Sequence, residues 1–286
     1  MPEYVRRPDW LRLQPLDPSV SRNMARLLRG LKLHTVCESA QCPNRTECFR
    51  TGTATFMILG DVCTRNCTFC AVPKGKTLEP DPQESSHVLE AISRLRLKYV
   101  VITSVTRDDL PDGGAAQFVS IIENIKGYDS NIMIEVLIPD FKGSLTALRS
   151  VIYARPTVIN HNIETVPRLY LEVRPKAAYQ RSLQLLARVK ETNPLILTKS
   201  GFMVGLGESR KEIIEVMHDL RSAQCDLLTI GQYLQPSFNH HEVLKYIPPE
   251  EFKEYESIGR ELGFTAVVAG PLVRSSFHAA DMFLSA

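Results

Sequence analysis

TATFMILGDVCTRNCTFC, residues 53–70, is the stretch that decides the fold of this chain. Residues 53–59 are mostly apolar or β-branched, which predicts a buried strand. Cys63, Cys67 and Cys70 follow with the spacing Cys-x3-Cys-x2-Cys. Three thiolates so close together can hold three irons of a cubane iron–sulfur cluster and leave the fourth iron open to a reactive ligand. The stretch therefore predicts a strand that leads directly into a metal-binding loop.

Strands and helices alternate along the rest of the chain. We expect strands at residues 53–59, 99–105, 131–138, 157–164, 195–205, 226–234 and 265–270. We expect helices around residues 88–95, 118–125, 143–153, 178–191, 209–222 and 249–262, the last two opened by Ser209 and by the pair Pro248-Pro249. This alternation predicts a parallel sheet with its chemistry at the carboxyl ends of the strands. Six strand–helix units are too few for a closed eight-stranded barrel, so the fold class expected is α/β, a partial (β/α)6 TIM-like barrel.

Two extensions are expected to flank this barrel. The barrel is assigned to residues 53–264, with an N-terminal extension at 1–52 and a C-terminal extension at 265–286. Prolines break up the start of the N-terminal extension, after which a helix is expected to begin at Ser19 or Ser21.

A second cysteine triplet lies in the N-terminal extension. Cys37, Cys42 and Cys48 have the spacing Cys-x4-Cys-x5-Cys. Clustered cysteines in a chain without a secretory signal are typical of metal ligands rather than of a disulfide framework. The seventh cysteine, Cys225, stands alone between an expected helix and an expected strand, and we expect it to be an inert core thiol.

Zinc is the alternative metal for such cysteines. Structural zinc sites usually use four protein ligands in paired Cys-x2-Cys halves. The 63–70 loop has one such pair, and His87 lies far beyond it, so a cluster is favoured. A zinc-stabilised scaffold or an electron carrier is the alternative from another class of function. Anaerobic protein that is brown, with about eight irons per chain, would indicate two cubanes.

Composition argues against several other classes of function. The 286 residues are 44% hydrophobic and 23% charged, with a formal net charge of +2. The chain has no long basic run of the kind that would indicate a nucleic-acid partner. No apolar run reaches membrane length and no signal-peptide pattern opens the chain, so we expect a cytoplasmic protein without a membrane partner. The sequence leaves the oligomeric state open, and a monomer is the default expectation.

The 63–70 loop resembles that of the radical S-adenosylmethionine enzymes. The resemblance lies in the cysteine spacing, in Phe69 just before the last cysteine, and in the position after the first barrel strand. It implies that Cys63, Cys67 and Cys70 are catalytic ligands of a [4Fe-4S] cluster whose open iron chelates S-adenosyl-L-methionine. One electron from the reduced cluster would then split this cofactor into methionine and a 5′-deoxyadenosyl radical. Phe69 is expected to contact the cofactor.

The chain as a whole is similar to the lipoyl synthases. The first cysteine triplet carries this similarity together with five strings in the order found in that family. They are PDWLR (8–12), TSVTRDDLPDGG (103–114), HNIETVPRLYLEVRP (161–175), TKSGFMVGLGE (198–208) and RSSFHA (274–279). One position departs from the pattern: the family more often has Tyr where this chain has Phe277, which removes a hydroxyl and leaves the neighbouring serines in place.

This similarity implies an auxiliary [4Fe-4S] cluster held by Cys37, Cys42, Cys48 and Ser276. A serine oxygen is a harder ligand than a thiolate and suits an iron–sulfide centre less well, so the iron on Ser276 should be the one most easily lost. The implied reaction is sulfur insertion at C6 and C8 of an octanoyl group that is amide-linked to a carrier lysine. The auxiliary cluster would donate both sulfurs and be consumed. Another radical sulfur-inserting or methylthiolating enzyme is the rival within the superfamily, against which the Arg-Ser-Ser end argues.

The implied partners are octanoylated carrier domains, such as the E2 subunits of 2-oxoacid dehydrogenases and the glycine cleavage H protein. An electron donor such as ferredoxin or flavodoxin and an iron–sulfur carrier are implied as well. The first 32 residues are locally basic and are either a solvated face or a dock for an acidic partner. The basic residues there are Arg6, Arg7, Arg12, Arg22, Arg26, Arg29 and Lys32.

Polar residues near expected strand ends are candidate contacts to S-adenosylmethionine. They are Ser104, Thr106, Asn162, Glu164, Arg174, Lys199 and Gln232. Ser104 and Thr106 are placed to meet the methionyl amino group, and a carboxylate such as Glu164 suits ribose hydroxyls. Arg174 and Lys199 are candidates for the methionyl carboxylate, with arginine favoured for planar pairing.

Two further groups are expected to be structural. His161 lies within an expected strand and is interpreted as a buried, hydrogen-bonded histidine, since radical chemistry needs no general base. Asp108 and Asp109 precede Pro111 and a Gly-Gly pair, so they are interpreted as caps of the next helix.

Overall fold

The computed structural model describes residues 6–11, 17–50 and 54–284. Its centre is one sheet of eight strands that lie in chain order. The strands are β1 (His34–Thr35), β2 (Thr55–Ile58), β3 (Tyr99–Ser104), β4 (Met133–Leu137), β5 (Val158–Asn160), β6 (Leu197–Val204), β7 (Leu227–Gln232) and β8 (Ala266–Gly270). Strands β2 to β8 are parallel, and β1 pairs antiparallel with β2. The expected partial barrel of six strand–helix units and a last short strand is confirmed.

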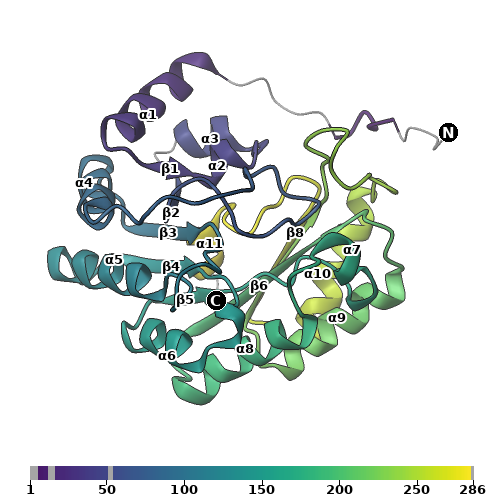
Figure 1. Ribbon diagram of the computed structural model, residues 1–286. Coiled ribbons are helices and arrows are strands. Elements are labelled where there is room, and N and C mark those ends of the chain that lie inside the picture. The colour runs from purple at the N-terminus through teal and green to yellow at the C-terminus, as the bar shows by residue number, and fades with distance from the viewer. Residues whose placement is uncertain (1–5, 12–16, 51–53, 285–286) are drawn as a thin grey trace.

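Six helices follow the parallel strands and cover the outer face of the sheet (Figure 1). They are α4 (Glu84–Leu95), α5 (Ala115–Tyr128), α6 (Leu145–Tyr153), α8 (Tyr179–Thr192), α9 (Arg210–Ser222) and α10 (Pro249–Glu261). Their apolar stripes are buried, as Phe118 and Ile122 of α5 illustrate. Ser209 caps α9 in a capping box with Glu212, and α10 begins at Pro249, both as expected.

The strand expected at 157–164 is shorter in the structure. It ends at Asn160, and Glu164, at the end of the expected range, has a positive φ of 67° that does not belong to a regular strand. The amides of Ile163 and Glu164 both donate to the carbonyl of Gly201, so the chain curls toward β6 instead. This curl turns Glu164 toward the carboxyl ends of the strands.

Helix α1 (Pro18–Gly30) confirms the helix expected to begin at Ser19 or Ser21, and starts one residue before Ser19. Short elements that the sequence pattern did not predict follow it, namely β1, α2 (Val36–Ser39) and α3 (Arg45–Arg50). Three short elements, η1 (Phe141–Gly143), η2 (Pro167–Leu169) and α7 (Tyr170–Val173), lie within loops after barrel strands. These pieces are too short to show a hydrophobic period, and tertiary contacts form them.

The final helix, α11 (Ala279–Leu284), anchors the C-terminal segment to the barrel. Met282 packs with Val158 and Leu227, which begin β5 and β7. The Phe283 ring lies 5.9 Å from that of Tyr99, the first residue of β3. The RSSF string just before α11 is therefore held close to the barrel at both of its ends. Among the described helices, none is long and apolar enough to cross a membrane.

Candidate functional site

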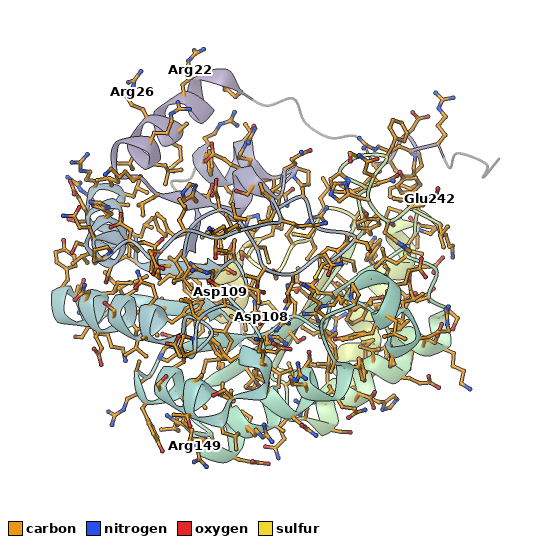
Figure 2. The ribbon with its side chains drawn as sticks, in the orientation of Figure 1. Arg22, Arg26, Asp108, Asp109, Arg149 and Glu242 are labelled. Atoms are coloured by element: carbon orange, nitrogen blue, oxygen red, sulfur yellow. The ribbon has the colours of Figure 1, made fainter. Side chains whose placement is uncertain are left out.

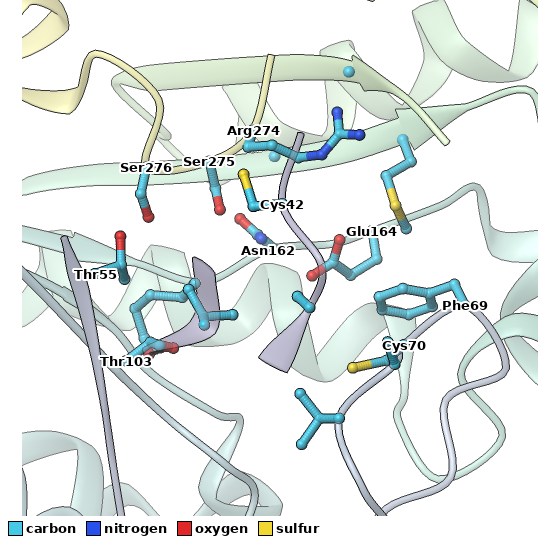
Figure 3. Close-up of a pocket in the computed structure, with 18 of the residues that line it drawn as sticks. Cys42, Thr55, Phe69, Cys70, Thr103, Asn162, Glu164, Arg274, Ser275 and Ser276 are labelled. Atoms are coloured by element: carbon cyan, nitrogen blue, oxygen red, sulfur yellow. Dashed lines mark hydrogen bonds between the residues drawn. The ribbon is translucent and has the colours of Figure 1, made fainter. Parts of the chain in front are cut away.

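A cavity of about 530 Å³ lies at the carboxyl ends of the strands and brings both cysteine triplets together. Its wall includes Cys37, Cys42, Cys48, Cys63, Cys67 and Cys70. Figure 3 shows Phe69 and Cys70 on one side of this cavity and Cys42 with Ser276 on the other. The two triplets belong to different segments of the chain, yet they line one cavity.

The 63–70 loop is fastened by backbone hydrogen bonds at several points. The Cys63 amide donates to Pro73 O at 2.8 Å, and the Thr68 amide donates to Val173 O at 3.0 Å. The His241 amide donates to Thr68 O at 3.0 Å, so a loop after β7 also holds this segment. The cysteine positions are therefore set by segments from across the barrel.

Five of the expected cofactor contacts at strand ends line the cavity: Ser104, Thr106, Asn162, Glu164 and Arg174. Phe69 lines it as well. Three polar atoms among them are buried without a protein partner, namely Ser104 Oγ, Asn162 Oδ1 and Arg174 Nε. Buried polar atoms are rarely left unpaired, so these three are the atoms of the cavity wall that could hold a polar ligand. The donor and acceptor set suits the amino-acid and ribose parts of S-adenosylmethionine.

Arg174 is the fixed cation of this part of the cavity. Its Nη1 donates to the carbonyls of Asn162 and Ile163 at 3.0 and 3.1 Å, and to the Tyr170 hydroxyl at 3.0 Å. Burial raises the pKa of the nearby Glu164 carboxyl, and the charge of Arg174 opposes this shift. Glycine is required at position 201 in the cavity wall, because a Cβ there would lie 2.3 Å from Thr229 Oγ1 and clash with it.

Two of the expected contacts are not brought to the cavity. Lys199 is the third residue of β6 and is 1% exposed; its Nζ pairs with Glu135 of β4 at 3.1 Å, inside the barrel. Gln232 is fully buried, and its Nε2 donates to the carbonyls of Val204 and Lys245. Burying either side chain without a partner would cost several kcal/mol, which explains why each one pairs with another buried group. The structure therefore does not place Lys199 to bind the methionyl carboxylate of the cofactor. Gln232 instead links β6 to the loop at Lys245 by hydrogen bonds.

The interpretation of Asp108 and Asp109 as helix caps is wrong. Asp112 caps α5 instead, accepting from the amides of Gly114 and Ala116. Asp109 accepts from Arg107, and Asp108 accepts from Arg65. Buried guanidinium groups compete for these carboxylates, and the sequence alone did not reveal that Arg65 and Arg107 point inward.

The auxiliary triplet and the Arg-Ser-Ser string meet through long-range contacts. Asn44, which lies between Cys42 and Cys48, donates from Nδ2 to Leu272 O at 2.7 Å. Close packing of the same segment on β7 requires Gly231, where a Cβ would lie 2.2 Å from Val273 O. Ser276 itself lines the cavity. The structure therefore places the expected fourth ligand in the wall of the same cavity as the expected triplet.

Burial dominates the ionisation of the cysteines. It raises the pKa of Cys37 to about 11 and that of Cys48 to about 12, with neighbouring cysteines adding to both shifts. Burial likewise raises the pKa of Cys70 to about 12. Thiols of this kind bind metal only as thiolates, so cluster binding must release their protons and supply positive charge. The donor set fits an iron–sulfur cluster in each triplet.

Among the described residues, no three His, Cys, Asp or Glu side chains converge closely enough to hold a single metal ion. A cubane is a larger object than an ion, since its irons and sulfides lie between the thiolates. The triplet sulfurs therefore need not meet at one point.

Several cavity residues were not singled out from the sequence. Arg274 places a guanidinium near Cys42, and burial lowers the pKa of Arg274 while the charge of Cys42 opposes this. Its membership of the Arg-Ser-Ser string was an available signal. Thr55 and Thr103 also line the cavity, from β2 and β3. The sequence predicts both threonines within strands, but which face of the sheet each side chain points to depends on how the strands pair.

His161 is a satisfied buried histidine, as interpreted. It is 2% exposed, with Nδ1 against Ile138 O at 2.8 Å and Nε2 against Ser182 Oγ at 3.0 Å. Burial lowers its pKa to about 4. Cys225 is likewise fully buried, and burial raises its pKa to about 12, which keeps the thiol protonated and unreactive.

His161 is expected to make the fold sensitive to acid. The unfolded histidine binds a proton near pH 6.5 and the folded one near pH 4, so its neutral form contributes fully above pH 6.5 and this contribution is lost as the pH falls toward 4. The loss amounts to about 3 kcal/mol of unfolding free energy. Denaturant unfolding across this pH range should show it in the parent chain and not in His161→Gln. Parallel pH profiles for the two proteins would contradict the assignment.

Comparison with known proteins agrees with this geometry. The model of the radical SAM superfamily matches residues 57–220. Two lipoyl synthases, from Caldanaerobacter subterraneus subsp. tengcongensis and Syntrophotalea carbinolica, are 58% and 55% identical to the chain. The alignments cover 98% and 96% of this chain and 98% and 89% of those proteins. The crystal structure of HydG, a maturase of the [FeFe]-hydrogenase, has the same fold, with a TM-score of 0.60, 14% identity, and coverage of 96% of this chain and 61% of that chain.

A partial barrel with a three-cysteine loop after its first parallel strand defines a radical S-adenosylmethionine enzyme. The catalytic class is therefore set by the fold and the loop together. Within that superfamily, the chain belongs to the lipoyl synthase family. It is accordingly a radical sulfurtransferase of lipoate biosynthesis that uses S-adenosylmethionine and two [4Fe-4S] clusters.

Proposed function

We propose that this chain inserts sulfur at C6 and C8 of an octanoyl group on a carrier lysine, with a separate role for each cysteine triplet. Cys63, Cys67 and Cys70 hold the cluster that binds S-adenosylmethionine. Cys37, Cys42, Cys48 and Ser276 hold the auxiliary cluster that donates sulfur. The observation that carries this proposal is the single cavity lined by both triplets and by Ser276. A substrate bound in this cavity would lie between the residues that would hold the radical-forming cluster and those that would hold the sulfur donor.

The bound cofactor and clusters supply the radical and the sulfur; the side chains position them. Ser104 Oγ, Asn162 Oδ1 and Arg174 Nε are the unpartnered atoms proposed to meet S-adenosylmethionine. Phe69 packs beside it, and Thr106 shapes the same wall. Arg274 contributes positive charge on the auxiliary side, where cysteine thiolates would otherwise repel one another. The apolar part of the wall excludes water from the reactive centre.

A single anaerobic turnover tests the proposed function. The reconstituted chain is mixed with S-adenosylmethionine, a strong reductant and an octanoyl-lysine peptide, and the peptide is weighed by mass spectrometry. A product carrying two sulfurs, with a matching loss of sulfide from the auxiliary cluster, is the expected result. Deoxyadenosine without sulfur in the peptide would refute this substrate. No deoxyadenosine from a chain with both clusters intact would refute the radical reaction.

The proposed carriers are folded domains, namely E2 subunits of 2-oxoacid dehydrogenases and the glycine cleavage H protein. Ferredoxin or flavodoxin is the proposed electron donor, and an iron–sulfur carrier is proposed to rebuild the auxiliary cluster. We place this work in the cytoplasm, on a monomer, without a nucleic acid or membrane partner. An octanoyl-lysine on a folded domain must approach the cavity mouth, so association with the carrier is transient.

Helix α1 is expected to speed that association through its basic side chains. Arg22, Arg26 and Arg29 are exposed, and Figure 2 shows Arg22 and Arg26 pointing outward from α1. Changing all three to Gln should slow association with an acidic carrier by about tenfold at low salt, because electrostatic steering is lost. Stopped-flow kinetics with the folded carrier measures this, and the exposed Arg149 of α6 changed to Gln is the control. Equal rates for the triple variant and the parent would rule out docking at α1.

A further inference from the structure

Arg65 lies in the middle of the 63–70 loop, yet it points into the protein. It is 5% exposed, although a charged residue in a short loop normally faces water. Its Nε and Nη2 make a bidentate pair with Asp108 at 2.8 and 2.9 Å. The same Nη2 reaches Asp140 Oδ1 at 2.5 Å. One guanidinium thus joins the cysteine loop to the loops after β3 and β4.

Asp140 is held in place for this contact by a strained turn. It is 2% exposed and also accepts from Arg181 Nη1 at 3.2 Å and from the Lys142 amide at 3.1 Å. Phe141 and Lys142, which follow it, both have positive φ, at 45° and 52°. Residues other than glycine rarely adopt such backbone angles and keep them only where the surroundings fix them. Burial alone would raise the pKa of the Asp140 carboxyl, but the hydrogen bond and charge of Arg65 outweigh it and hold that pKa well below its usual range.

The backbone beside Arg65 acts on a proposed cluster ligand. The Arg65 amide donates to Cys63 Sγ, with a nitrogen–sulfur distance of 3.4 Å. The preceding residue, Thr64, is also held by hydrogen bonds. Its Oγ1 donates to Thr106 O at 2.9 Å and accepts from the Asp108 amide at 3.0 Å. Both residues after Cys63 are therefore tied by their side chains to the loop after β3. That double attachment fixes the peptide that donates to the sulfur.

We propose that Arg65, anchored by Asp108 and Asp140, is a positioning residue that holds its own amide on Cys63 Sγ and thereby sets the reduction potential of the cluster in the 63–70 loop. This inference rests on the proposed ligand role of Cys63, Cys67 and Cys70. A hydrogen bond to a ligating sulfur draws electron density from the cluster, which stabilises the reduced state and raises the potential. Reduction of this cluster is the step on which radical formation depends.

Arg65→Lys is the primary test, because it keeps the charge and removes the bidentate fork. The midpoint potential is measured by EPR-monitored reductive titration in a background where Cys37, Cys42 and Cys48 are alanine, so that one cluster contributes. We expect the midpoint of Arg65→Lys to be more negative than that of its parent. Arg181→Lys is the matched control, since Arg181 shares Asp140 but does not touch the cysteine loop. It should keep the parent midpoint.

Thr64→Val is the second test and leaves every charge unchanged. It should shift the midpoint in the same direction as Arg65→Lys, and it decides the question if Arg65→Lys fails to fold or to hold a cluster. Amide hydrogen exchange in the cluster-free chain gives an independent readout: peptides covering residues 60–70 should exchange faster in Arg65→Lys and Thr64→Val than in Arg181→Lys.

Parent midpoints in both Arg65→Lys and Thr64→Val would overturn the positioning role and leave Arg65 as a structural ion pair. That result differs from failure of the proposed ligand assignment. In the latter case the parent chain itself would show no EPR signal that S-adenosylmethionine perturbs.

Discussion

Ser276→Ala is expected to cleave S-adenosylmethionine at the parent rate and to give at least tenfold less doubly sulfurated product. Ser276 lines the same cavity as both triplets, but Figure 3 shows it on the side of Cys42, away from Cys70. Removing the proposed fourth oxygen ligand leaves the auxiliary triplet with three cysteines. Losing even an indirect partner of a metal site commonly costs about 10–100-fold in metal affinity, so losing a direct ligand should cost at least as much.

The measurement is paired: deoxyadenosine by chromatography and peptide sulfur by mass spectrometry from the same reaction. The next residue, Phe277, has no side-chain oxygen that could replace the lost ligand. Ser275→Ala serves as the control for removal of a neighbouring hydroxyl. Loss of deoxyadenosine formation in Ser276→Ala would contradict the separation of roles between the two triplets.

Ser276→Cys should act in the opposite direction on the cluster. A thiolate is a softer ligand than a serine oxygen, so the auxiliary cluster should bind more tightly and release sulfur more slowly. Iron content and single-turnover rate together check this. Full cluster occupancy with an unchanged rate would show that the hardness of the ligand does not control sulfur release.

Glu164→Gln is expected to weaken S-adenosylmethionine binding by about 10–100-fold, since a hydrogen bond to a charged group is worth roughly 1.5–3 kcal/mol. Glu164 lines the cavity, and its positive φ of 67° turns it out of the strand path. Hydrogen bonds of Glu164 O and N to the β6 backbone hold this conformation. Calorimetric titration of the reconstituted chain measures the affinity.

Glu208→Gln is the matched control for this substitution. Glu208 is also a carboxylate whose pKa is raised by burial, but it accepts from the amides of Gly205 and Leu206 in a turn outside the cavity wall. We expect Glu208→Gln to lower thermal stability and to keep the affinity. Equal affinities for Glu164→Gln and the parent would remove Glu164 from the cofactor site.

Local sequence signals predicted the elements that depend on near neighbours. The capping box at Ser209, the start of α10 at Pro249 and the alternation of strands and helices all arise from interactions within a few residues. The short helices α2, α3, α7 and α11 were missed, because a helix of four to six residues is stable only through packing.

The same limit applies to the candidate site. Arg174 and Lys199 were both candidates for the methionyl carboxylate, with arginine favoured, but only Arg174 lines the cavity, while Lys199 pairs with Glu135 inside the barrel. The sequence position of Asp108 favours a helix cap, but in the structure Asp108 accepts a hydrogen bond from the inward-pointing Arg65. Each distinction depends on which way a side chain faces, and that direction is set by strands far away in sequence.

The fold class and the candidate cluster ligands follow from cysteine spacing and hydrophobic period, which are local properties of the chain. The placement of Cys42, Cys70 and Ser276 around one cavity depends on long-range contacts such as that of Asn44 with Leu272. The tertiary structure also decides which polar atoms stay unpaired there. The physical reason is that these placements depend on sheet register and on the docking of α11, which sum many weak long-range contacts that no single stretch of sequence contains.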